Sequence, residues 1–212
     1  MKKIPNTSKY LRSLIAFDWW KVILAGIAVS VLVYYAFYMK LSLKRYEQLQ
    51  IFTTAEITDE KIINDLEEHL KDDGTLEVTI DTTDVESKYY EVQLDTSGFG
   101  NGDILILPAS KVIDNERLVQ NSLLFTDEFI NEMNQSSSSL EFLKYEEYTF
   151  AIKIYDKEDA SYNENLHFNT WAAFDDTYYM MFAKKSPNLG KYGDKSKEEH
   201  SSAIKAAHYL LK

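Results

Sequence analysis

The pattern of hydrophobic and polar positions separates an uncharged stretch near the N-terminus from a longer region of regular alternation. Residues 22–39 read VILAGIAVSVLVYYAFYM and contain no charged side chain. As a helix with a rise of about 1.5 Å per residue, this stretch would be roughly 27 Å long. It would be apolar on every face, whereas a surface helix carries a polar stripe. We therefore expect a transmembrane helix at 19–40, between an N-terminal segment at 1–18 and a juxtamembrane linker at 41–48.

The residues around this stretch agree with a membrane location. Trp19 and Trp20 stand at one end and Tyr34, Tyr35 and Tyr38 at the other, and such amphipathic rings prefer the membrane interface. More basic residues precede the stretch than closely follow it, which by the positive-inside rule favours a cytoplasmic N-terminus. The expectation is a single-pass protein of the cell membrane with an extracellular C-terminal domain. A cleaved secretory signal is the alternative, but YMKLSLKRY follows in place of a small-x-small cleavage site.

The remaining region, 49–212, begins with a pattern of alternating strands and helices. A first strand is expected at 49–57, and Thr58 can cap a helix that ends at Gly74. TLEVTID (75–81) alternates as a half-buried strand does, and a short helix is expected at 86–96. The consecutive aliphatic residues at 104–107 predict a central strand that is buried on both faces. This β-α-β-α-β order favours a parallel sheet, with any ligand past the carboxyl ends of its strands.

The sequence of residues 125–212 predicts fewer regular elements. A helical turn or two is expected within 125–133, followed by an exposed polar loop at 134–139. EEYTFAIKIYD (146–156) alternates as a strand does, and HFNTWAAF (167–174) with TYYMMFAKK (177–185) predicts a hairpin joined near Asp175 and Asp176. The last helix shows a narrow apolar stripe suited to packing on a sheet, formed by Ala203, Ile204, Ala207, Leu210 and Leu211.

The charges are divided unevenly between the two parts of the chain. Residues 1–45 contain eight basic residues and one acidic residue. Of 23 basic and 34 acidic residues in all, 15 and 33 therefore remain from Tyr46 onward, a net charge of −18. Such a domain repels nucleic acid, which we exclude as a partner. The acidity either keeps the domain soluble or attracts a cationic ligand.

No motif points to catalysis. Gly98, Gly100 and Gly102 lead into a strand, whereas phosphate-binding glycine loops leave a strand and open a helix. The histidines lack metal-ligand spacing, and 156–165 lacks the glycine and glutamate of a calcium-binding loop. The chain has no cysteine and no GxSxG nucleophile motif. We expect a protein that is not an enzyme and holds neither a cofactor nor a metal.

Four stretches carry a family resemblance: FDWWK (17–21), LQIFTTAEITDEKI (49–62), GDILILPAS (102–110) and YYMMFAKKSPNLG (178–190). Together they resemble small membrane-anchored proteins of Gram-positive bacteria with a reduced extracellular solute-binding domain, of the periplasmic-binding-protein-like class II fold. The chain has room for little more than one of the two lobes usual in that family. The resemblance implies a three-layer α/β domain similar to one lobe, with a small-molecule ligand and transporter subunits as partners.

Position after the expected strands gives the candidate ligand-binding residues. These are Thr54 and Glu56 after the first strand, Thr82 and Asp84 after the second, and Ser110 after the third. The expected function is that of a membrane-anchored, extracytoplasmic binding or accessory component of a membrane transporter, with the lipid bilayer as partner of residues 19–40. The alternative is a structural or regulatory membrane subunit, whose degenerate domain contacts a partner protein and binds no small molecule.

Overall fold

The computed structural model describes residues 7–41, 43–135, 140–163, 167–194 and 196–212. The chain forms two compact units, Met1–Leu43 and Lys44–Lys212, and each is considered by itself. Most of the polar loop expected at 134–139 lies outside the described residues.

The first unit contains one long helix, α1 (Thr7–Leu41), and it corrects the expectation of a transmembrane helix at 19–40. Within the described part of the chain, no helix is both long and apolar enough to cross a membrane.

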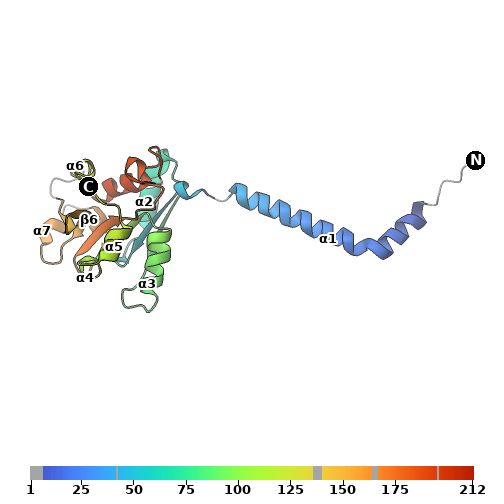
Figure 1. Ribbon diagram of the computed structural model, residues 1–212, viewed down its shortest axis with the longest axis horizontal. Coiled ribbons are helices and arrows are strands. Elements are labelled where there is room, and N and C mark those ends of the chain that lie inside the picture. The colour runs from blue at the N-terminus through green and yellow to red at the C-terminus, as the bar shows by residue number, and fades with distance from the viewer. Residues whose placement is uncertain (1–6, 42, 136–139, 164–166, 195) are drawn as a thin grey trace, which may run out of the picture. The chain divides into compact units, whose positions relative to one another are not determined.

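The second unit is an α/β domain around one mixed, six-stranded sheet (Figure 1). The strand order is β3-β1-β4-β8-β6-β5, in which β1 pairs in parallel with both β3 and β4, and the pairs β4–β8, β8–β6 and β6–β5 are antiparallel. The bounds are β1 (Gln48–Thr53), β3 (Glu77–Thr82), β4 (Ile104–Pro108), β5 (Phe142–Tyr145), β6 (Tyr148–Tyr155) and β8 (Tyr178–Phe182). A second, two-stranded sheet pairs β2 (Glu56–Ile57) with β7 (Ala172–Ala173).

Helices cover both faces of the large sheet. The α-helices are α2 (Lys61–Leu70), α3 (Tyr90–Gln93), α4 (Ala109–Val112), α5 (Glu116–Asn121), α6 (Asp127–Met133), α7 (Ala160–Asn163) and α8 (Ser202–Leu210). The other helical turns are η1 (Arg45–Glu47), η2 (Lys71–Asp73), η4 (His167–Thr170) and η5 (Gly190–Tyr192), together with the π-helix η3 (Leu94–Gly100).

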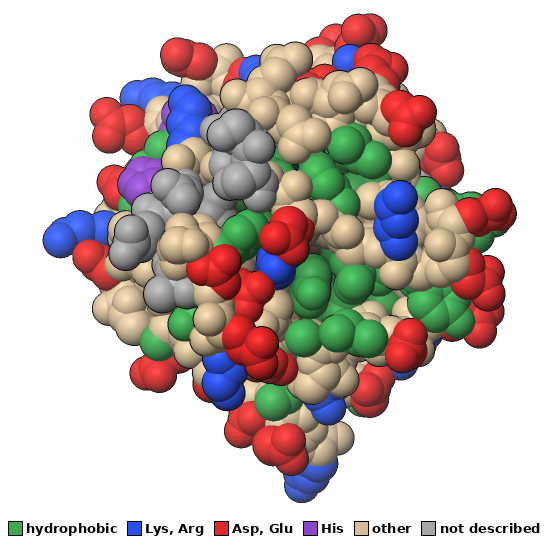
Figure 2. Space-filling model, turned by 90° about the vertical axis from the view of Figure 1, so that its left-hand side faces the viewer, with side chains coloured by type: hydrophobic (Ala, Val, Ile, Leu, Met, Phe, Trp, Pro, Cys, Tyr) green, Lys and Arg blue, Asp and Glu red, His purple; other side chains and the backbone are tan. Residues whose placement is uncertain are grey.

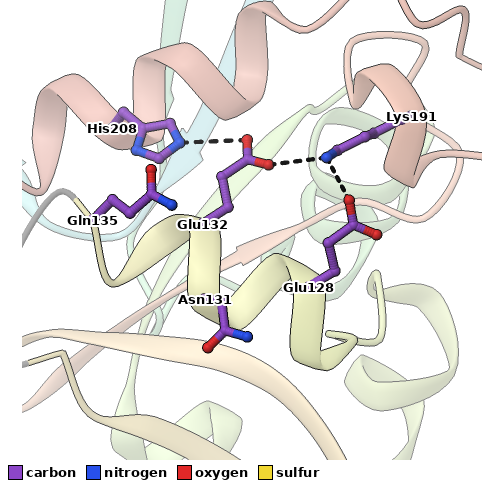
Figure 3. A pocket seen from close by; sticks show the side chains of 6 residues that line it. All are labelled: Glu128, Asn131, Glu132, Gln135, Lys191 and His208. Carbon is purple, nitrogen blue, oxygen red and sulfur yellow. Dashed lines mark hydrogen bonds and ion pairs between the residues drawn. The ribbon is translucent and has the colours of Figure 1, made fainter.

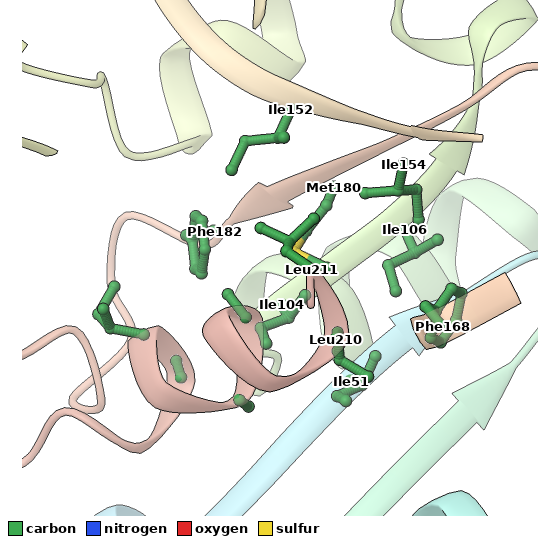
Figure 4. Packing of buried hydrophobic residues seen from close by; sticks show 14 of the residues in the cluster. Ile51, Ile104, Ile106, Ile152, Ile154, Phe168, Met180, Phe182, Leu210 and Leu211 are labelled. Atoms are coloured by element: carbon green, nitrogen blue, oxygen red, sulfur yellow. The ribbon is translucent and has the colours of Figure 1, made fainter. Parts of the chain in front are cut away.

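Alternate residues along the strands enter two separate cores, because successive side chains of a strand point to opposite faces. Ile51, Ile104 and Met180 share one core with α2, α6 and α8, and Figure 4 shows these three side chains close to the last helix. Phe52, Leu105 and Met181 share the other core with α3, η3 and α5. The domain therefore has three layers, and β4 is buried along its whole length as its aliphatic run predicts.

Long-range pairing corrects three local predictions. The strand expected at 49–57 is divided, because β1 ends at Thr53 and β2 pairs with β7 in the second sheet. The hairpin expected around Asp175 and Asp176 does not form, since β8 pairs instead with β4 and β6. The strand expected within 75–81 begins later, because Leu76, one of its alternating apolar residues, is largely exposed and precedes β3.

Candidate functional site

The strand order places a topological switch point at β1. The chain leaves β1 through α2, which covers one face of the sheet, and reaches β3 on one side of β1. It then passes through α3 and η3 on the opposite face to reach β4 on the other side. In open α/β sheets, ligands bind outside the carboxyl ends of the strands at such a point. We call this end of β1, β3 and β4 the carboxyl edge.

Backbone hydrogen bonds hold the loops of the carboxyl edge side by side. The Thr54 N–H donates to the Ile106 carbonyl at 3.2 Å, and the Thr83 N–H donates to the Thr53 carbonyl at 3.0 Å. The Ala109 N–H donates to the Thr177 carbonyl at 2.7 Å. The segment that precedes β8 therefore joins the loops after β1, β3 and β4 at this edge.

Thr54 lies near Tyr178, which follows two aspartates in the chain. The Tyr178 hydroxyl donates to Asp175 Oδ1 at 3.0 Å. Burial raises the pKa of Tyr178 to about 12, and the nearby Thr54 hydroxyl opposes part of that rise. The buried Thr54 Oγ1 has no hydrogen-bond partner within the described part of the chain.

Tyr90 contributes a second buried hydroxyl from the start of α3. Its side chain is 4% exposed, and its hydroxyl finds no hydrogen-bond partner among the described residues. Burial raises the pKa of Tyr90 to about 12, with a smaller contribution from Tyr178. The Lys111 ammonium lies 5.2 Å from the centre of the Tyr90 ring, where it covers the aromatic face.

The structure brings together only some of the residues that the sequence proposed. Thr54 approaches Tyr178, and the Ser110 N–H lies 3.4 Å from Asp176 Oδ2, so both meet the same segment. Thr82 ends β3 and pairs with Thr53, with its side chain exposed. Asp84 is exposed and accepts from the Glu86 N–H at 2.8 Å, while Glu56 lies in the second sheet.

Sequence reasoning missed Tyr90 and Tyr178, whose side chains are buried at this edge. Both lie in stretches that were expected to be regular elements, and tyrosine in such a position is ordinarily part of a core. No spacing in the sequence relates them to Thr54, because they meet only through the strand order. Tyr178 reaches the edge through the pairing of β8 with β4, which places it beside Pro108.

The chemistry of the edge is that of hydrogen bonding between neutral hydroxyls and carboxylates. No group of three or more histidine, aspartate or glutamate side chains within the described ranges is placed to hold a metal ion. Comparison of the chain with protein-family models, with curated proteins and with solved structures finds no match. The protein can therefore be classified only by its three-layer α/β fold, and its candidate site only by the geometry of this edge.

Proposed function

We propose that the domain of residues 44–212 is a binding module that holds a small polar molecule at the carboxyl edge. The observation that carries the proposal is the pair of buried hydroxyls, of Thr54 and Tyr90, that lack partners at the switch point of the sheet. A buried polar group without a partner costs about 1–3 kcal/mol, which a ligand can recover by hydrogen bonding to it. The resemblance to solute-binding domains favours a role as the binding component of a transport system.

The ligand chemistry follows from the groups at the edge. Thr54 and Tyr90 can each donate and accept, whereas Asp175 and Asp176 accept only. A ligand that carries several hydroxyl or amino groups would satisfy both kinds of partner. This favours a polyhydroxylated or amino-substituted solute over an apolar one.

The same groups favour binding over catalysis. A tyrosine whose pKa is about 12 stays protonated at neutral pH and is a weak general base. Tyr90 then serves as a fixed hydrogen-bond donor, whereas the Tyr178 hydroxyl already donates to Asp175. We therefore propose a module that is not an enzyme.

Thermal-shift screening of the full chain against sugars, amino acids and polyols tests this proposal. A ligand at a hundredfold excess over its Kd should stabilise the protein by about 2.7 kcal/mol. Tyr90→Phe and Thr54→Val should reduce that ligand-induced shift, whereas Tyr148→Phe, at an exposed tyrosine of β6, should leave it unchanged. If no compound raises the melting temperature, or if both edge variants respond like the wild type, binding at this edge is wrong.

Contact with a partner protein is the second candidate function. Tyr89 and Val92 are more than half exposed and lie three residues apart, so they share one side of the α3 region. Large apolar side chains that are exposed together are typical of protein contacts. Tyr89→Ser with Val92→Ser would abolish such a contact and leave any small-molecule shift intact.

A further inference from the structure

A hollow of about 500 Å³ lies between α6, η5 and α8, away from the residues of the carboxyl edge (Figure 3). We call it the α6–α8 hollow. Its lining residues come from segments far apart in the sequence and are all polar: Glu128, Asn131, Glu132, Gln135, Lys191 and His208. The volume lies within the range of about 300–1,000 Å³ that is usual for small-molecule sites.

The charged groups of the hollow converge on Glu132. The Lys191 ammonium lies 2.6 Å from Glu128 Oε1 and 3.3 Å from Glu132 Oε2. The Tyr192 hydroxyl donates to Glu132 Oε2 at 2.5 Å. From α8, His208 Nε2 faces Glu132 Oε1 at 3.7 Å, as Figure 3 shows.

The hollow carries a negative charge at neutral pH. Burial opposes the ionisation of Glu132, but hydrogen bonds from Tyr192 and Lys191 outweigh it and lower the pKa of this carboxyl group. Burial also lowers the pKa of His208, against the attraction of Glu132, so the imidazole is neutral at pH 7. Two carboxylates then face one ammonium, which leaves a net charge of about −1.

A cationic ligand can take the place of the Lys191 ammonium beside the two glutamates. The Lys191 side chain is 45% exposed, and solvent screens an ion pair at such exposure, so the pair is weak. A carboxylate offers about four acceptor positions, so Glu132 keeps capacity beyond its described partners. The exposed amides of Asn131 and Gln135 add donors and acceptors at the rim.

We propose that the α6–α8 hollow binds an organic cation with a primary ammonium or guanidinium group, which pairs with Glu132 and Glu128 in competition with the Lys191 ammonium. The acidic surface supports this ligand class, because residues 46–212, with a net charge of −18, concentrate cations and repel anions. Figure 2 shows acidic side chains spread over one face of the domain, with fewer basic ones among them. The site is separate from the proposed function at the carboxyl edge and does not depend on it.

Calorimetric titration of the full chain with agmatine, at low ionic strength, tests the proposal. We expect saturable binding that Glu132→Gln weakens by at least about tenfold, with Glu128→Gln as the second variant if the first unfolds. Glu116→Gln, at an exposed glutamate of α5, is the matched control and should bind like the wild type. Succinate, an anion of similar size, should give no saturable heat.

Lys191→Met separates the proposal from general attraction by an acidic surface. Removal of the competing ammonium should strengthen agmatine binding several-fold, whereas Lys144→Met, at an exposed lysine of β5, makes the same change in net charge and should alter it little. The proposal is overturned if the wild type shows no saturable binding at millimolar agmatine, or if neither glutamate variant weakens it. Equal effects of Lys191→Met and Lys144→Met would overturn it too.

Discussion

The buried polar groups at the two ends of the parallel strands differ in whether they have hydrogen-bond partners. At the amino ends, the fully buried Asp103 precedes β4, and its Oδ2 accepts from the Arg45 guanidinium at 3.0 Å and from the Gln50 N–H at 2.8 Å. Its Oδ1 accepts from the Ser186 hydroxyl at 2.5 Å. At the carboxyl ends, the buried hydroxyls of Thr54 and Tyr90 have no partner within the described ranges.

This difference separates the part of the sheet that secures the fold from the part available to a ligand. Asp103 joins η1, β1 and the segment after β8 through groups that already satisfy it. A carboxylate so placed gains nothing from a ligand. Hydroxyls without partners lower the stability of the free protein and can gain hydrogen bonds on binding.

The largest expected effect is at the amino end. Asp103→Ala leaves the buried Ser186 hydroxyl without its acceptor, while the partly exposed Arg45 guanidinium keeps its backbone carbonyl acceptors, and a buried polar group without a partner costs about 1–3 kcal/mol. Chemical denaturation of the full chain measures the loss. Asp103→Asn, which keeps the shape, should cost less, and Asp72→Ala, on the exposed turn η2, should cost almost nothing. If Asp103→Ala lowered the free energy of unfolding by less than about 1 kcal/mol, Asp103 would not stabilise the fold, and the proposed difference between the two ends of the strands would be wrong.

A smaller effect of opposite sign is expected at the carboxyl end. Tyr90→Phe and Thr54→Val each remove a buried hydroxyl without a partner, and should stabilise the ligand-free protein by about 1 kcal/mol. The same denaturation experiment measures this gain, with Tyr148→Phe as the neutral control. Destabilisation by both variants would mean that these hydroxyls already have partners, and the two ends would then be alike.

A third effect appears only at alkaline pH. Tyrosine has an ordinary pKa of about 10, and burial raises the pKa of Tyr90 in the folded protein to about 12. The unfolded chain therefore loses this proton first, and the stability present below pH 10 falls as the pH rises toward 12. Tyr90→Phe should show a shallower fall in stability over this interval than the wild type. Identical slopes would show that Tyr90 is not buried as a neutral group.

Much of the secondary structure could be predicted from local patterns. The aliphatic run at 104–107 gave a fully buried strand, and the apolar stripes of α2 and α8 gave helices that pack on the sheet. Thr126, whose hydroxyl accepts from the Phe129 N–H, begins the helix expected within 125–133. These features depend on neighbours in the sequence, so the sequence reveals them.

The candidate site could be predicted only in outline. A β-α-β-α-β pattern placed it past the carboxyl ends of the strands, and this reasoning reached Thr54 and Ser110. It also selected Glu56, which the division of the first strand carries into the second sheet. Tyr90 and Tyr178 were missed because their roles depend on which elements become neighbours in space.

The sequence by itself determined the periodicity of the elements, the central buried strand and the acidity of the domain. Only the tertiary structure decided that β8 lies between β4 and β6, that Asp103 meets Arg45, and that Glu132 faces His208 across the hollow. The physical reason is that side-chain periodicity is fixed by local backbone geometry. Contacts between distant segments depend instead on how all the layers bury their apolar faces together.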